Sequence, residues 1–153
     1  MTKIFVAGST GYIGKNVVKY ALDNGFDVVT AKRHSDNKPG QLNKKLKVIK
    51  ISNNDNNWMA DLEKVDVIIS CLASRTGEPK DAHLVDYKLN CLLLEKAKAL
   101  KCSQFILLSA ICVQKPRLAF QFEKLAFEEE LKKSGLNFSI VRPTAYFKSL
   151  SGQ

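Results

Sequence analysis

The segment KIFVAGSTGYIG, residues 3–14, decides the fold of this chain. It begins with a short apolar run typical of a buried strand, and Gly8, Gly11 and Gly14 follow at intervals of three. In a strand–turn–helix unit the first glycine allows a tight turn, the second lets the backbone approach a pyrophosphate, and the third lets the helix pack closely on the strand. We interpret this segment as a dinucleotide-binding loop; a glycine-rich turn without a ligand is the alternative. The candidate cofactor contacts here are Gly8, Thr10, Gly11, Tyr12, Ile13 and Gly14.

Outward from this loop, short apolar runs alternate with amphipathic ones. The expected strands are Lys3–Ala7, Asp27–Ala31, Leu46–Ile51, Val65–Leu72, Gln104–Ser109 and Asn137–Val141. The expected helices are Gly11–Asn24, a weak turn near Asn56–Glu63, Ala82–Leu100 and Leu118–Ser134. This alternation predicts the α/β class: a Rossmann-like, doubly wound parallel sheet of six strands with helices on both faces. Residues 1–153 are expected to form one such domain.

The composition argues against a membrane-spanning protein and against a nucleic-acid-binding protein. The 153 residues are 45% hydrophobic and 25% charged, as in soluble globular proteins, and no apolar run is long enough to cross a bilayer. The segment before the first strand leaves no room for a targeting peptide, which predicts a cytoplasmic protein unless upstream sequence is missing. The net charge of +9 comes from lysines scattered among acids, which argues against nucleic-acid binding and favours an anionic cofactor and substrate.

Cysteines and histidines give no sign of a metal centre. Cys71, Cys91, Cys102 and Cys112 lack metal-type spacing and are expected to serve as small core hydrophobes. His34 and His83 are single, so no metal site is predicted.

The end of the second strand indicates which nicotinamide cofactor binds. NAD enzymes commonly carry an acid there for the ribose 2′-hydroxyl, but this chain has Lys32 and Arg33 and no acid before Asp36. Arg33 can grip a 2′-phosphate in a bidentate contact, so NADPH is the predicted cofactor. The alternative is that Lys32 and Arg33 only solubilise a loop.

Three further blocks carry a family resemblance: SCLASRTG (residues 70–77), LSAICVQKP (residues 108–116) and VRPTAYFKSL (residues 141–150). With the glycine spacing, they resemble the atypical short-chain dehydrogenases with NmrA-like Rossmann domains, and among these the NADPH-dependent divinyl chlorophyllide a 8-vinyl reductases. The resemblance runs over essentially the whole chain. It implies reduction of the C8 vinyl group of divinyl chlorophyllide or protochlorophyllide to ethyl, with peripheral contact to photosynthetic membranes. Family members continue beyond the point matching Gln153, so much of the family's substrate-binding part is expected to be absent.

The resemblance also assigns candidate catalytic residues. Short-chain dehydrogenases usually carry Tyr-x-x-x-Lys on the helix after the fifth strand, and this register reads Phe120 to Lys124 here. Loss of the phenol removes the usual acid for a carbonyl oxygen, which suits a C=C substrate. Lys124 is expected to anchor the nicotinamide ribose or to donate a proton; a solvent-facing lysine is the alternative. Ser109 is expected beside the nicotinamide, with a strand-end cap as the alternative.

The remaining candidates surround the expected cofactor and substrate. Ala73, Ser74, Arg75, Pro143 and Thr144 are assigned to the cofactor, and Phe120, Tyr87 and Tyr146 to the substrate. Arg75 could instead bind a substrate propionate or lie on the surface, and Asp86 and Tyr87 could serve only in packing. A competing function is a non-catalytic NADPH sensor or assembly protein of the NmrA-like type. The sequence carries no signal for the oligomeric state.

Overall fold

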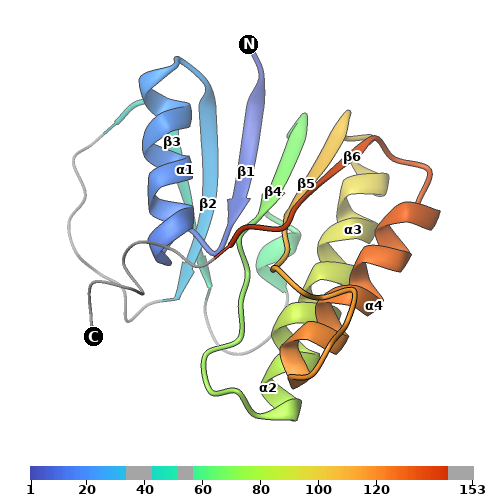
Figure 1. Cartoon of the computed structure of the whole chain (residues 1–153). Coiled ribbons are helices and arrows are strands. Elements are labelled where there is room, and N and C mark those ends of the chain that lie inside the picture. The colour runs from blue at the N-terminus through green and yellow to red at the C-terminus, as the bar shows by residue number, and fades with distance from the viewer. Residues whose placement is uncertain (34–42, 52–56, 145–153) are drawn as a thin grey trace.

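The computed structural model describes residues 1–33, 43–51 and 57–144. Its six strands form one parallel sheet in the order β3-β2-β1-β4-β5-β6 (Figure 1). The strands are β1 (Lys3–Ala7), β2 (Asp27–Arg33), β3 (Leu46–Ile51), β4 (Val67–Ser70), β5 (Gln104–Leu108) and β6 (Phe138–Val141). The chain winds outward from β1 in both directions, so the strand order reverses between β1 and β4. In open parallel sheets, ligands bind at the carboxyl ends of the strands beside such a switch point.

Helices cover both faces of the sheet. The helix α1 (Tyr12–Asp23) lies on one face, and α3 (Leu89–Ala99) and α4 (Ala119–Lys133) lie on the other (Figure 1). The latter face also carries α2 (Pro79–Ala82), which continues through the π-helical segment η3 (His83–Lys88) into α3; a 3-10 turn, η2, spans Asn57–Met59. The predicted six-stranded, doubly wound Rossmann-like sheet is confirmed.

Alternation along β1 divides the core into two layers. Phe5 and Ala7 belong to the cluster that includes Phe105 and Phe127, on the α3 and α4 side. Ile4 and Val6 belong to the cluster that includes Ala21 of α1. Successive side chains of a strand point to opposite faces, so a continuous apolar run is what a strand covered on both sides requires.

The element boundaries differ from the expected ones in two informative places. The helix expected from Ala82 begins at Pro79, because proline is favoured in a first helical turn, where its missing N–H costs no hydrogen bond. Between α2 and α3 the helix widens into the π-helical turn of η3, which no sequence pattern indicated. Among the cysteines, Cys102 is buried as expected, whereas Cys112 is exposed because it lies in the turn that follows β5.

The glycine loop holds α1 against β1 at backbone contact distance. A Cβ built on Gly14 would lie 2.2 Å from the carbonyl oxygen of Gly8. A Cβ built on Gly8, whose φ is +73°, would lie 2.5 Å from the carbonyl oxygen of Cys71. Both neighbours are backbone atoms that cannot rotate away. The first and third glycines are therefore required by packing alone.

This packing predicts that Gly14→Ala lowers the free energy of unfolding by about 2–3 kcal/mol, the usual range for forcing a methyl group into a filled site. Gly11→Ala is the matched control, because a Cβ there meets only the Gly8 carbonyl oxygen, at 3.3 Å; we expect it to cost less than about 1 kcal/mol. Urea unfolding followed by circular dichroism measures both. Equal losses in the two variants would contradict the packing argument.

Candidate active site

The carboxyl edge of the sheet carries the turn that opens α1. The amide of Gly11 donates to the carbonyl of Gly8 at 3.0 Å and closes this turn. Gly11 is the N-cap residue, and no side chain caps that end of the helix. The space at Gly11 and the positive end of the helix dipole together fit a pyrophosphate. Of the other predicted contacts in the loop, Thr10 and Ile13 are half-buried and Tyr12 is exposed.

The end of β2 places a cation where an NAD enzyme has an acid. β2 runs to Arg33, two residues further than expected, and the Arg33 side chain is exposed. Hydrogen bonds from the amides of Thr76 and Arg75, and more weakly the charge of Arg33, hold the pKa of Asp81 below its ordinary value. Arg33 therefore shares this edge with the loop after β4. Asp36 lies outside the described residues.

Two acids fix the loop that follows β4. A single oxygen of Asp81 accepts hydrogen bonds from the amides of Arg75 (2.8 Å) and Thr76 (3.0 Å). The amide of Ser74 donates to Asp86 Oδ2 at 3.2 Å. Of the residues predicted to border the cofactor, Ser74 and Arg75 are thus held in place through their amides, whereas Ala73 and the Arg75 side chain are exposed.

A hollow of about 210 Å³ opens between the ends of β4 and β5. It contains five of the predicted site residues, contributed by two strand-end loops and by α4. The lining consists of Leu72, Ala73, Ser74, Asp86, Leu108, Ser109, Ala110, Phe120 and Lys124. Phe120 and Lys124 are one turn apart on α4, so they present the same helix face to this hollow.

Lys124 is buried at the floor of the hollow, with 5% of its surface exposed. Its ammonium donates to the carbonyl oxygens of Leu72 (3.1 Å), two residues after β4, and Leu108 (3.3 Å), the last residue of β5. Asp86 Oδ1 lies 3.0 Å from Lys124 Nζ in a buried ion pair. The structure therefore excludes the alternative of a solvent-facing lysine. Nearby, burial raises the pKa of the Cys71 thiol to about 11, so this thiol stays protonated at neutral pH.

Ser109 belongs to a second buried polar cluster, beside the first. Its hydroxyl donates to Glu128 Oε1 at 2.5 Å, and its amide donates to the carbonyl of Val141. Arg142, just after β6, donates from Nε to Glu128 Oε1 at 3.1 Å and from Nη2 to Glu128 Oε2. The cluster ties the ends of β5 and β6 to α4. The proton of the Ser109 hydroxyl is already engaged, although its oxygen can still accept a hydrogen bond.

The carboxyl group of Glu128 is fully buried, yet its pKa is lowered. Burial, the largest single influence, raises its pKa, but hydrogen bonds from Arg142 and Ser109 together with the charge of Arg142 outweigh burial and hold the pKa below its ordinary value. A buried charge that is paired and hydrogen-bonded in this way is tolerated in a protein interior.

Pro143 and Thr144, which were predicted to contact the cofactor, do not line this hollow. The carbonyl of Pro143 accepts a hydrogen bond from the amide of Ile111 at 3.1 Å, which joins the loops after β6 and β5. Thr144 is exposed. Tyr146 lies outside the described residues.

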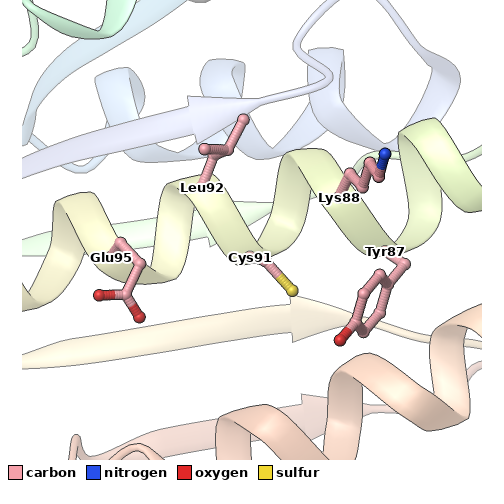
Figure 2. A pocket seen from close by; sticks show the side chains of 5 residues that line it. All are labelled: Tyr87, Lys88, Cys91, Leu92 and Glu95. Carbon is pink, nitrogen blue, oxygen red and sulfur yellow. The ribbon is translucent and has the colours of Figure 1, made fainter.

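Tyr87 is not brought to the hollow between β4 and β5. It lines a separate, shallow hollow of about 330 Å³ along η3 and α3, together with Lys88, Cys91, Leu92 and Glu95. Figure 2 shows the side chains of Tyr87 and Cys91 pointing toward α4. The Cys91 thiol, followed by burial, raises the pKa of the Tyr87 phenol above its ordinary value. Asp86 and Tyr87 are consecutive residues of the π-helical segment η3 and line different hollows, so Asp86 reaches the site and Tyr87 does not.

Two residues of these clusters were not assigned from sequence. Glu128 and Arg142 belong to no catalytic motif that we considered, although Glu128 continues the buried stripe of α4 formed by Lys124, Phe127 and Leu131. An acid on an apolar helix face is a signal that could have marked Glu128. In the described parts of the chain, no cluster of three or more acids, cysteines or histidines could hold a metal ion, and no helix is long and apolar enough to cross a membrane.

Comparison with known proteins identifies the family of this site. The family model described as NAD(P)H-binding matches residues 8–150, from the first glycine of the loop to beyond β6. This chain belongs to the NAD(P)H-binding family. Its cofactor is therefore a nicotinamide dinucleotide, in agreement with the glycine loop.

Relatives and solved structures differ in how similar they are to this chain. It is 45% identical to the chloroplastic divinyl chlorophyllide a 8-vinyl-reductase of Cucumis sativus, over 99% of this chain and 41% of the relative. It is 32% identical to the photosystem II assembly factor Ycf39 of Cyanophora paradoxa, over 98% of this chain and 47% of that protein. The chain thus spans less than half the length of these relatives. A UDP-glucose 4-epimerase of Thermotoga maritima shares the fold, with a TM-score of 0.77 and 23% identity over 92% of this chain and 55% of the epimerase.

The ionised Glu128 predicts a specific dependence of stability on pH. Because folding lowers its pKa, its stabilising contribution is present above the ordinary value near 4.5 and is lost as the pH falls through the lower folded value. We expect Glu128→Gln to lower the free energy of unfolding at pH 7 by about 1–3 kcal/mol. The gap to the unsubstituted protein should narrow between about pH 5 and pH 3.

Urea unfolding across that pH range measures the effect. Glu129→Gln is the matched control, since Glu129 pairs with Lys132 on the surface; it should cost less than about 0.5 kcal/mol at every pH. A pH-independent loss in Glu128→Gln would show that the carboxylate is not ionised in the fold.

Proposed function

We propose that this domain binds NADPH for reduction of the C8 vinyl group of divinyl chlorophyllide or protochlorophyllide to ethyl. The observation that carries the proposal is the identity of 40–45% to four plant proteins named divinyl chlorophyllide a 8-vinyl-reductase, each over 98% or more of this chain. The arrangement of Phe120 and Lys124 in the hollow is compatible with that chemistry. When bound, NADPH supplies the hydride.

The chain's own residues would divide the remaining work. The glycine loop would hold the pyrophosphate, and Arg33 the 2′-phosphate. Phe120, which lines the hollow, would stack against a flat ring of the substrate or cofactor. Lys124 would supply the positive charge or the proton that reduction of a C=C bond requires, since Phe120 has no hydroxyl. Ser109 would position neighbouring groups through Glu128 and offer its oxygen only as an acceptor.

The domain assignment and the compartment are part of the proposal. Under this proposal, residues 1–153 form the NADP-binding domain. The protein acts in the cytoplasm, or in the plastid if a targeting segment precedes Met1; the four plant relatives carry the word chloroplastic in their names. Contact with photosynthetic membranes would be peripheral.

A second candidate function is supported by one observation. Relatives named photosystem II assembly factor Ycf39 match nearly the whole chain, at 32% identity in Cyanophora paradoxa and 25% in Guillardia theta. Under this alternative the domain binds NADPH as a sensor or assembly protein and performs no pigment reduction. The lower identity makes it the less favoured of the two.

The preference for NADPH is tested with Arg33→Ala. Loss of a charge-assisted contact to the 2′-phosphate should weaken NADPH binding by about 1–3 kcal/mol and leave NADH binding nearly unchanged. Isothermal titration of both cofactors measures the difference. Lys133→Ala, which removes an exposed cation at the far end of α4, is the control for net charge. Equal weakening of both cofactors by Arg33→Ala would show that Arg33 does not read the phosphate.

The reaction itself is tested by joining residues 1–144 to the remaining C-terminal part of the Cucumis sativus relative. Given NADPH and divinyl chlorophyllide, this protein should form the monovinyl pigment, and chromatography separates the two pigments. The plant relative serves as the positive control. Tight NADPH binding without turnover, in a folded chimaera, would favour the assembly-protein alternative.

A further inference from the structure

The carboxylate of Asp86 is the group most deeply enclosed at the hollow between β4 and β5. It is fully buried, and it lies on the π-helical turn η3 rather than on a regular helix. π-Helical turns inside α-helices are found frequently at functional sites. Asn90 also fixes the backbone of Asp86: its amide nitrogen donates to the Asp86 carbonyl at 3.0 Å, and its Oδ1 accepts a hydrogen bond from Ser70 Oγ at 2.5 Å.

The two oxygens of this carboxylate have different partners. Oδ2 accepts a hydrogen bond from the Ser74 amide, in the loop predicted to border the cofactor. Oδ1 receives no hydrogen bond within the described residues, and its close partner there is the Lys124 ammonium at 3.0 Å. A buried carboxylate is costly unless it is paired, so the ion pair with Lys124 is what offsets its burial.

Lys124 is likewise satisfied by three groups from three elements. Two are the neutral carbonyls of Leu72, in the loop after β4, and Leu108, at the end of β5. The third is Asp86, the one charged partner among the residues that the structure describes. A lysine side chain is long and flexible, and without a counter-charge its ammonium gains by extending toward water. Asp86 is therefore the group that retains the ammonium at the floor of the hollow.

We infer that Asp86 is a positioning residue for the nicotinamide end of the cofactor site: it holds the Lys124 ammonium between the ends of β4 and β5, and through its other oxygen it holds the Ser74 amide on the opposite wall. The inference goes beyond the proposed pigment reaction. It concerns cofactor binding by this chain, so its test needs no pigment and stands if the pigment assay fails.

The test measures the dissociation constant for NADPH by isothermal titration in the 153-residue chain. Asp86→Asn keeps the shape of the side chain and an oxygen for the Ser74 amide but removes the charge. Asp86→Asn combined with Lys124→Met leaves the site neutral and keeps the aliphatic stem. Asp23→Asn, which breaks the exposed pair with Lys19, is the matched control and should leave the affinity within about twofold.

We expect Asp86→Asn to weaken NADPH binding about tenfold, the usual scale for removing one charge-assisted positioning contact. Lys124→Met alone should weaken it by a similar factor, and the double variant should bind no more weakly than either single variant. Such non-additivity shows that Lys124 contributes only while Asp86 holds it, and a purely structural role would not produce it in folded protein. The inference is overturned if Asp86→Asn binds NADPH like the unsubstituted chain, whether or not the double variant binds more weakly. The inference is also overturned if the losses of NADPH affinity in the single variants multiply in the double variant.

Circular dichroism first establishes that each variant is folded. Removing one partner of a buried pair can unfold a domain. If Asp86→Asn fails to fold while the neutral double variant folds, the carboxylate is needed only because of Lys124. The affinity of the double variant then decides: a tenfold loss supports the positioning role, and unchanged affinity overturns it. If the double variant does not fold either, the pair holds the fold itself and the inference is overturned.

Discussion

The contact between the backbones of Gly8 and Gly14 sets the geometry on which the rest of the molecule depends. Because no side chain separates the two backbones at Gly8 and Gly14, α1 begins close to the carboxyl end of β1. In this position the positive end of the α1 helix dipole faces the crevice between β1 and β4. The Cys71 carbonyl also lies close to Gly8, so the loop after β4 borders the same crevice. One steric constraint thus places both walls of the cofactor site.

The second half of the sheet is organised by charge rather than by close backbone contact. Two acids, Asp86 and Glu128, are fully buried, and each is matched by a cation and by further hydrogen bonds. Apolar pairs of similar volume could stabilise such sites as well or better. The ionic clusters contribute placement: they fix the ends of β4, β5 and β6 relative to α4. The hollow lies among those strand ends.

The sequence was sufficient for the fold and for the cofactor loop, because both depend on local patterns: glycine spacing, apolar strands and amphipathic helices. It was also sufficient to place Lys124 and Phe120 on one face. It did not show that Asp86 pairs with Lys124 or that Glu128 engages Ser109, since these contacts join elements far apart in the chain. Tyr87 was misplaced for a different, local reason: it lies in the π-helical turn η3, which no residue pattern indicated.

The position of Lys124 and Glu128 on one helix has a consequence for the order of folding. Until α4 docks, Asp86 and the carbonyls of Leu72 and Leu108 have no cation, and Arg142 and Ser109 have no carboxylate. A half-docked helix would leave charges desolvated without partners, which is a state of high free energy. We therefore expect α4 to dock in one cooperative step, so that hydrogen exchange at the ends of β5 and β6 should report the opening of a single unit rather than gradual fraying.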